Sequence, residues 1–450
     1  RSSEMKHLLS LRLGAVGAAA ALIVGLTGCA SETTQTTVKS EGPVQLDFWY
    51  SVGGSSADAL LKQVNAFNTS NKHQITINAI YQGDYAATAA KLTNAVQSGD
   101  TPPLFQGGDT FTAYLHDSGL ATIPASISPF DGGKFNRDSV ATAAANYYTI
   151  NSELWAVPMM VSQPAVFFNP AVLAQAGINP AERPKNIQEL FDWADTIHEA
   201  TGTPGLVFQH NEWWNEQFSA SNGFAYCTPD NGLGTEPANA FDYVNNELVA
   251  TWTHYQKSLK KGAILNVGSD GTAAQRAFSS QQAAMLLASS ASLGTTAAAA
   301  KFTIDALPLP VASDKGGAVP GGSALWILGE GRQPSEQAAA LEFAEFMGSA
   351  DVQKEIFKDS GYLPSSKAAL DELKGSETDP AKKALLEQLA STKDVKAAAG
   401  CHNGAFGQSR ADVRSAIQSI ADGADVRATL TTAQDKGTAA LKAYNERVKR

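Results

Sequence analysis

The chain is short of positive charge. Its 450 residues include 34 Lys and Arg against 44 Asp and Glu, which gives a formal net charge of −10. No block rich in Lys and Arg occurs anywhere in the sequence. Because a protein needs a basic face to bind the phosphates of nucleic acid, this composition argues against nucleic acid as the partner.

Catalytic and metal-binding motifs are also missing. The seven histidines are scattered, and none forms the His-Glu-x-x-His spacing of zinc enzymes. Neither a Gly-x-Ser-x-Gly nucleophile turn nor a Gly-x-x-x-x-Gly-Lys-Ser/Thr phosphate loop is present. We therefore predict no enzyme activity, no cofactor and no metal. Two carboxylates from distant segments could still act as an acid–base pair, so a secreted lipoprotein that hydrolyses glycans stays open as the alternative.

The apolar run near the N-terminus is too short to cross a membrane. Residues 13–28 follow the basic residues Lys6 and Arg12. They supply about 15 apolar residues, whereas a membrane span needs roughly 20, and such a run is typical of an export signal. The segment Leu26–Cys29 resembles the lipobox of bacterial lipoproteins, in which the cysteine is lipidated and becomes the first residue of the mature chain. A short membrane anchor with an incidental cysteine is the alternative.

Lipidation of Cys29 would place the mature protein outside the cytoplasm, anchored to the cell membrane. We assign residues 1–28 to the signal peptide and residues 29–43 to a flexible tether, because Ser31–Pro43 is polar and has no apolar periodicity. The other two cysteines, Cys227 and Cys401, then lie where disulfides persist. They form the only possible pair of the mature chain, and whether they meet stays open.

Strand and helix patterns alternate from residue 44 onward, which predicts an α/β fold with largely parallel sheets. Apolar spacing typical of helices alternates with short β-type runs. Asn186 and Glu189 form a capping box, and glycines end two of the helical patterns. The expected strands are 44–50, 74–80, 164–169 and 205–209, and the expected helices cover 60–67, 85–97, 187–197 and 241–259.

Several aromatic residues stand at or near junctions of these elements, beside Gly, Asn, Ser or Asp. Core packing explains any one of them. As a set they are typical of a polyol site, because ring faces cover the C–H patches of a sugar while polar groups take its hydroxyls. These residues are Trp49, Tyr50, Tyr85, Trp213, Trp214 and Tyr362.

A series of short segments spans nearly the whole mature chain. They are DFWYS (47–51), YQGDY (81–85), SGDTPPLFQGGD (98–109), VPMMVSQPAVFFNPAVLAQAGI (157–178), EQFSASNG (216–223), ASSASLG (288–294), PGGSALWIL (320–328) and SGYLPSS (360–366). In sequence and in order, these segments resemble those of the family 1 extracellular solute-binding proteins of ABC importers. Within that family the chain is most similar to the glycerol-3-phosphate-binding branch.

The resemblance implies a fold of two α/β lobes with a ligand held between them. Each lobe is expected to be a mainly parallel sheet flanked by helices, and the chain to cross between the lobes three times. The implied function is to close on a solute and present it to a membrane permease. The crossovers are expected near 159–163, 307–319 and 362–366, which gives lobe 1 as 44–160 plus 318–363 and lobe 2 as 161–317 plus 364–450.

The resemblance also implies the ligand-binding residues. In the family an acid accepts hydrogen bonds from ligand hydroxyls, and a glycine pair lets backbone N–H groups approach the ligand. A serine stands at a helix N-terminus, where free N–H groups hold an anion or a hydroxyl. The positions of this chain that match are Tyr85, Asp109, Ser162, Ser290 or Ser292, Gly321, Gly322 and Tyr362.

Two positions depart from the glycerol-phosphate branch. The branch stacks its ligand on a tryptophan in the region of Trp213 and Trp214, and which ring takes this role stays open. A gap-free alignment puts Phe406 at the position of an arginine that clamps phosphate, and Arg410 or Arg414 could replace it only after a local shift.

Phosphate binding needs N–H donors, and Phe406 has none. We therefore expect a sugar or oligosaccharide as the ligand, ahead of glycerol 3-phosphate or a glycerophosphodiester. The expected partners are this small molecule and an ABC permease, and the protein is expected to be a monomer.

Overall fold

The computed structural model describes residues 37–40 and 42–448. Cys29, the predicted signal peptide and the first part of the predicted tether lie outside the described residues. In the rest of the tether, residues 37–40 form no helix or strand, and Val38 packs against the hydrophobic core. Within the described ranges, none of the helices combines the length and the hydropathy needed to span a bilayer.

The first sheet has five strands in the order β2-β1-β3-β14-β6. β1 pairs in parallel with β2 and β3, while β14 runs antiparallel to both of its neighbours. The alternating pattern of β1 buries Leu46, Phe48 and Tyr50 on one face. The strands are β1 (Val44–Tyr50), β2 (Ile75–Tyr81), β3 (Leu104–Gly108), β6 (Val157–Ser162) and β14 (Gly321–Ile327).

The second sheet also has five strands, in the order β11-β8-β12-β7-β13. β8 pairs in parallel with β11 and β12, and β7 runs antiparallel to β12 and β13. Every residue of β7 is buried, as expected for a strand covered on both faces. The strands are β7 (Pro164–Phe168), β8 (Leu206–Val207), β11 (Ile264–Leu265), β12 (Met285–Ser289) and β13 (Asp305–Pro308).

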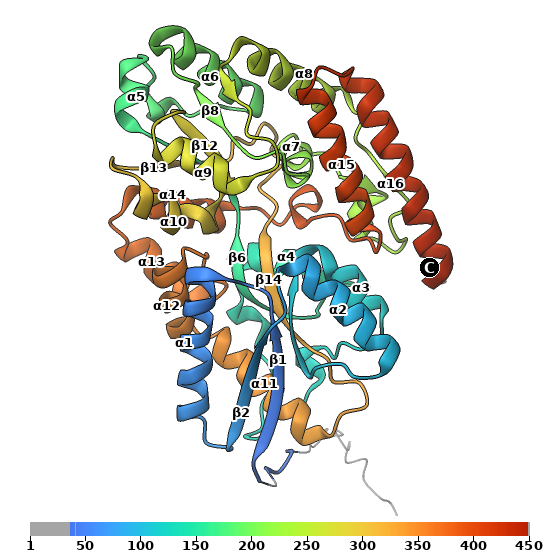
Figure 1. The fold of residues 1–450 in the computed structure, drawn as a ribbon. Coiled ribbons are helices and arrows are strands. Elements are labelled where there is room, and N and C mark those ends of the chain that lie inside the picture. The colour runs from blue at the N-terminus through green and yellow to red at the C-terminus, as the bar shows by residue number, and fades with distance from the viewer. Residues whose placement is uncertain (1–36, 41, 449–450) are drawn as a thin grey trace, which may run out of the picture. The chain divides into compact units, whose positions relative to one another are not determined.

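The chain passes from one sheet to the other at β6–β7 and at β13–β14 (Figure 1). Gln163 lies between β6 and β7, and its side-chain amide donates to the carbonyl of Ala318 and to Thr392 Oγ1. Leu363 bridges to Val161 of β6 shortly after the end of α12 (Ala350–Ser360). Segments far apart in sequence are thus hydrogen-bonded to one another where the chain changes sheet.

Helix boundaries follow local capping signals. α2 starts where Asp84 accepts a hydrogen bond from the amide of Ala87 and ends at Gly99, whose φ of 74° is left-handed. α6 starts where Asn186 accepts from the amide of Glu189, as the sequence predicts. The Glu189 carboxylate accepts from Lys185 N rather than from Asn186, so the predicted capping box is only half formed.

One predicted helix start is wrong. The spacing from Phe241 to Leu259 predicts a single helix, but α8 begins at Asn246, after the Asn245 side chain caps the amide of Leu248. Phe241 instead belongs to β10, which pairs with β9 in a two-stranded ribbon. An apolar residue at helical spacing can therefore come from a strand that packs on the same core.

The helices cover both sheets, and α15 and α16 lie side by side against α8 (Figure 1). Two short ribbons, β4–β5 (Thr149–Ile150 and Glu153–Leu154) and β9–β10 (Cys227–Thr228 and Ala240–Phe241), complete the strands. The helices are α1 (Gly54–Ser70), α2 (Tyr85–Ser98), α3 (Thr112–Asp117), α4 (Thr142–Asn146), α5 (Pro170–Gln175), α6 (Ile187–Thr201), α7 (Trp213–Ser221), α8 (Asn246–Lys261), α9 (Gly271–Ser279), α10 (Leu293–Ala299), α11 (Pro334–Met347), α12 (Ala350–Ser360), α13 (Lys367–Ser376), α14 (Pro380–Ser391), α15 (Phe406–Ala421) and α16 (Val426–Val448).

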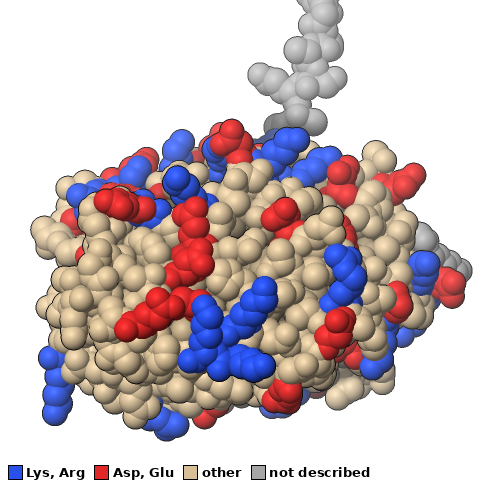
Figure 2. Space-filling view, turned by 90° about the horizontal axis from the view of Figure 1, so that it is seen from above, with Lys and Arg blue, Asp and Glu red and all other residues tan. Residues whose placement is uncertain are grey.

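Acidic and basic side chains are interspersed on the face shown in Figure 2. Opposite charges also pair across neighbouring helices, as between Lys261 of α8 and Asp195 of α6. On the face in view, no single-sign basic field appears of the kind that nucleic acid requires.

Candidate functional site

Asp109 stands at the end of a central strand of the first sheet. β3 ends at Gly108, and Asp109 opens the short 3-10 helix η1 (Asp109–Phe111) with only 8% of its surface exposed. A Cβ on Gly108 would lie 3.2 Å from the ring of Tyr85. The glycine therefore lets the tyrosine ring lie directly on the strand end beside the acid.

Tyr362 and Tyr148 join Tyr85 around this acid. The hydroxyls of Tyr85 and Tyr362 are 3.4 Å apart. Tyr148 is buried, and its hydroxyl has no hydrogen-bond partner in the structure. Burial, and then the negative charge of Asp109, raise the pKa of Tyr148. Tyrosine rings with neutral hydroxyl groups therefore lie around one carboxylate.

The electrostatic environment of Asp109 is unusual for an acid. Burial raises the pKa of Asp109 to about 6. The positive charge of Arg410 opposes this rise, and the negative charge of Glu216 adds to it. Asp109 belongs to the first sheet, whereas Glu216 lies on α7 and Arg410 on α15. α15 contacts η1, so elements associated with both sheets meet at this acid.

Glu216 is the most deeply buried charged group of this region, with 1% of its side chain exposed. Its Oε2 accepts a hydrogen bond from Arg410 Nη2 at 3.0 Å. Its Oε1 accepts from the Tyr147 hydroxyl and from the backbone N–H of Cys401, both at 3.2 Å. Burial raises the pKa of Glu216, and Arg410 opposes that rise.

Arg410 carries the positive charge of the cluster. Its guanidinium lies 4.7 Å from the centroid of the Phe406 ring, one helical turn earlier on α15. Burial disfavours its charge, but the carboxylates of Glu216 and Asp109 outweigh that effect and raise the pKa of Arg410. Its Nε is buried and has no hydrogen-bond partner. We refer to Tyr85, Asp109, Tyr147, Tyr148, Glu216, Tyr362 and Arg410 as the polar cluster.

The two tryptophans at the start of α7 differ in surroundings. Trp214 Nε1 donates to the carbonyl of Gln209 at 3.0 Å, and its ring packs against Phe208 and Phe218 in the core. Trp213 Nε1 is buried and has no hydrogen-bond partner. Because Trp213 and Glu216 are three residues apart on one helix, they share a face.

Trp213 also touches the glycine pair. A Cβ on Gly321 would lie 3.0 Å from Cζ2 of Trp213 and 3.2 Å from Ser162 Oγ. Gly322 has a φ of 98°, and a Cβ there would lie 2.0 Å from the carbonyl oxygen of Met160. Gly322 is therefore required by the pairing of β14 with β6, while Gly321 makes room for the indole.

The structure does not bring Trp49 and Tyr50 to the polar cluster. Trp49 lines a surface hollow of about 510 Å³ together with Asp47 and Arg332. The ring of Tyr50 packs against Tyr81 at 5.4 Å. Consecutive residues of a strand point to opposite faces, and neither face of β1 carries its aromatic residue to Asp109.

The predicted serines also have structural partners. Ser290 is fully buried, and its Oγ accepts a hydrogen bond from the backbone N–H of Gln163, where the chain passes between the sheets. Ser292 Oγ donates to the carbonyl of Ser289 at 2.7 Å. Ser162 is the serine that lies beside Gly321 and Trp213.

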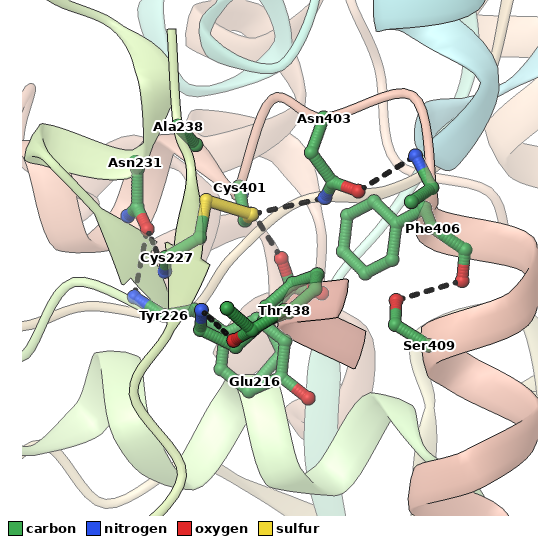
Figure 3. The surroundings of a disulfide bond; sticks show 12 residues. Glu216, Tyr226, Cys227, Asn231, Ala238, Cys401, Asn403, Phe406, Ser409 and Thr438 are labelled. Atoms are coloured by element: carbon green, nitrogen blue, oxygen red, sulfur yellow. Dashed lines mark hydrogen bonds between the residues drawn. A yellow bond between two sulfur atoms is a disulfide. The ribbon is translucent and has the colours of Figure 1, made fainter. Parts of the chain in front are cut away.

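A disulfide joins Cys227 and Cys401, which are 174 residues apart in sequence and 5.7 Å apart at their Cα atoms (Figure 3). It fixes the segment that leads into α15. Asn403 donates to Cys401 Sγ and accepts from the amide of Ala405, beside Phe406. Since the amide of Cys401 also donates to Glu216, this linkage helps to position the Glu216–Arg410 pair.

Sequence reasoning missed Glu216, Tyr147 and Tyr148. Glu216 stands three residues after Trp213, so helical spacing could have placed it on the same face. The tyrosines follow an alanine-rich stretch and carry no local signal that separates them from core residues. Only their contacts with Glu216 and Asp109 distinguish them.

The family model of the bacterial extracellular solute-binding proteins matches residues 62–384 of the chain. The sn-glycerol-3-phosphate-binding periplasmic protein UgpB of Rhizobium meliloti is 24% identical over 414 residues, covering 90% of this chain and 95% of that protein. UgpB of Salmonella typhimurium is 26% identical over 454 aligned positions, covering 98% and 99%.

Solved structures show the same fold. The crystal structure of UgpB from Mycobacterium tuberculosis in complex with glycerophosphocholine has a TM-score of 0.71 at 22% identity, covering 89% of this chain and 99% of that one. The sugar-binding protein MalE from Xanthomonas citri has a TM-score of 0.74 at 16% identity, covering 90% and 100%. The predicted α/β fold of two lobes is thereby confirmed. The sheets, however, are mixed rather than mainly parallel, because β14 and β7 each run antiparallel to both of their neighbours.

Proposed function

Because this chain belongs to the bacterial extracellular solute-binding proteins, we propose that it is the substrate-binding component of an ABC importer. It captures a sugar, oligosaccharide or polyol phosphate between two lobes and delivers it to a membrane permease. It binds this solute without chemical turnover. The similarity to UgpB proteins along nearly the whole chain supports this proposal.

The proposed lobes are 44–160 plus 318–363 and 161–317 plus 364–450. In support, the first range contains one five-stranded sheet apart from the last two residues of β6, and the second range contains the other sheet. The chain leaves a sheet at 163, at 309–320 and near 363. Hinge closure around a ligand needs crossover segments of this kind, because a few residues there absorb the backbone rotation.

The proposed ligand site is the polar cluster together with Trp213, Ser162 and Gly321. The observation that carries the proposal is the burial of Asp109 among tyrosine rings, opposite Glu216 and Arg410 from the other lobe. A carboxylate and an arginine bind the hydroxyls of a polyol, while aromatic faces cover its C–H groups. Contact with both lobes would favour the closed state.

We further propose that the protein is exported and that Cys29 is lipidated, with residues 29–43 as the tether. The sequence of the lipobox-like segment supports this, and a lipid anchor would keep a monomeric binding protein beside its permease. Metabolic labelling with a fatty-acid probe tests it: labelling that survives Cys29→Ser would refute lipidation at this residue.

A thermal-shift screen tests the binding proposal. Sugars, oligosaccharides, polyols, glycerol 3-phosphate and glycerophosphodiesters are added separately, because a ligand that binds the native state raises its stability. We expect at least one compound to bind with a Kd of about 1 µM, or roughly −8 kcal/mol. Release of a hydrolysis product would instead support a glycan hydrolase that uses the buried carboxylates Asp109 and Glu216.

A further inference from the structure

The cation of the proposed site is already held by a carboxylate. Arg410 Nη2 donates to Glu216 Oε2, and the two side chains are 17% and 1% exposed. The other oxygen of Glu216 is fixed by the hydroxyl of Tyr147 and the amide of Cys401. The acid cannot turn away from Arg410 without leaving these two donors unpaired in a buried place.

Asp109 adds a second negative charge beside the same arginine. The charges of Asp109 and Glu216 both act on Arg410, and each acid also acts on the other. The nearby Glu212 already has its own partner, Arg414, which donates to it from two nitrogens at 2.8 and 2.9 Å. The buried groups around Arg410 therefore carry at least as much negative as positive charge when they are ionised.

An anionic ligand would add to this negative charge. A phosphate monoester carries about −1.5 to −2 at pH 7, and a phosphate oxygen would have to compete with Glu216 for the Nη atoms. A hydroxyl oxygen brings no charge, and the unpartnered Nε of Arg410 offers it a donor. Stacking on Phe406 leaves the guanidinium edge for such a contact.

We propose that Glu216 is a specificity-determining residue that holds Arg410 and so excludes anionic ligands from this site. The ligand is then a sugar or polyol that carries no phosphate or carboxylate group. This inference rests on the proposed function, since it takes the polar cluster to be the place where the solute binds. Glu216 acts through Arg410 and is a positioning residue with respect to the ligand.

The first test compares matched ligands with the unaltered protein. Isothermal titration calorimetry measures each neutral compound of the screen and its phosphate ester, for example glucose and glucose 6-phosphate or glycerol and glycerol 3-phosphate. We expect the phosphate to weaken binding by about tenfold or more, which corresponds to about 1.4 kcal/mol. Tighter binding of the phosphate than of its neutral partner overturns the inference.

The second test removes the charge of Glu216. Glu216→Gln keeps an oxygen that accepts from Tyr147 and Cys401 but frees Arg410. We expect the ratio between the affinities for the neutral and the phosphorylated ligand to shift by about tenfold, or about 1.4 kcal/mol, in favour of the phosphate. Glu212→Gln is the matched control: it removes one charge from the N-cap of the same helix, four residues earlier, yet leaves Arg410 with Glu216.

Discrimination that is the same in Glu216→Gln, Glu212→Gln and the unaltered protein overturns the role of Glu216. If Glu216→Gln does not fold, as judged by near-ultraviolet circular dichroism, the matched-ligand comparison decides by itself. Failure of every neutral and phosphorylated compound to bind the unaltered protein overturns the proposed function, and the inference with it. Tight binding of phosphates alone overturns only the inference.

Discussion

At the scale of single residues, the site depends on charges that the protein itself buries. Asp109 and Glu216 are 8% and 1% exposed, and Arg410 is the cation that compensates them. Asp109 could be predicted from the sequence because it lies in a segment, 98–109, that resembles a known family. Helical spacing could have placed Glu216 on the face of Trp213, but its pairing with Arg410, 194 residues away in sequence, carries no local signal.

Asp109→Asn is expected to weaken binding of a neutral sugar by about tenfold or more. A hydrogen bond to a charged group is worth about 1.5–3 kcal/mol, and the amide is an uncharged acceptor of the same shape. Calorimetric titration measures the effect. Asp100→Asn, at an exposed position, is the control and should leave the Kd unchanged. An Asp109→Asn affinity within a factor of two of the original would place the ligand elsewhere.

The buried acid also predicts a pH dependence of stability in the ligand-free protein. Burial raises the pKa of Asp109 from its ordinary 3.8 to about 6. Between these values the native state holds a proton that the unfolded state has lost, so the contribution of Asp109 to the free energy of unfolding falls as pH rises. The raised pKa of Glu216 acts in the same direction.

This contribution is isolated by urea unfolding of the original protein and of Asp109→Asn at pH values from about 4 to about 7. We expect Asp109→Asn to become more stable, relative to the original, as pH rises through this window. A stability difference that does not change with pH would show that Asp109 keeps an ordinary pKa.

At the scale of elements, local signals predict boundaries where the cap or the periodicity is complete. The strand at Val44–Tyr50 is found as predicted, and α2 ends at Gly99 as its helix-stop signal indicates. The start of α8 was misplaced because Phe241 packs on the same core from a neighbouring strand. The antiparallel directions of β7 and β14 follow from long-range pairing, which no local pattern encodes.

Gly322 is the residue on which the central strand β14 most clearly depends. Gly322→Ala is expected to lower the free energy of unfolding by more than the about 1–2 kcal/mol that a left-handed conformation costs, since a Cβ would lie 2.0 Å from the carbonyl of Met160. Gly54→Ala is the control, because Gly54 also has a positive φ but open space around it. Equal losses in the two variants, measured by urea unfolding, would contradict this.

At the scale of the whole chain, side-chain contacts join the two proposed lobes. The hydroxyl of Tyr444 on α16 donates to Asp117 Oδ2 of α3 at 2.8 Å. Tyr147 of the first proposed lobe bonds Glu216 of the second. Such contacts contribute to ligand affinity if they form only when the lobes close.

Tyr444→Phe tests this coupling away from the proposed ligand site. Loss of one hydrogen bond, about 0.5–1.5 kcal/mol, is expected to weaken the affinity for the solute by a few fold while the ring still packs. Stopped-flow binding should show a faster dissociation rate with little change in association. Tyr114→Phe, on α3, is the control. An unchanged dissociation rate in Tyr444→Phe would show that this contact does not stabilise the ligand-bound state.

The most direct measurement is a thermal-shift screen of the purified protein in which each compound is also recovered and analysed after incubation. We expect one or more uncharged sugars to raise the melting temperature and to be recovered unchanged. At a concentration of 100 Kd, such a ligand adds about 2.7 kcal/mol to the free energy of unfolding. A screen in which no sugar or polyol raises the melting temperature, or in which the stabilising compound is hydrolysed, would contradict a solute-binding role.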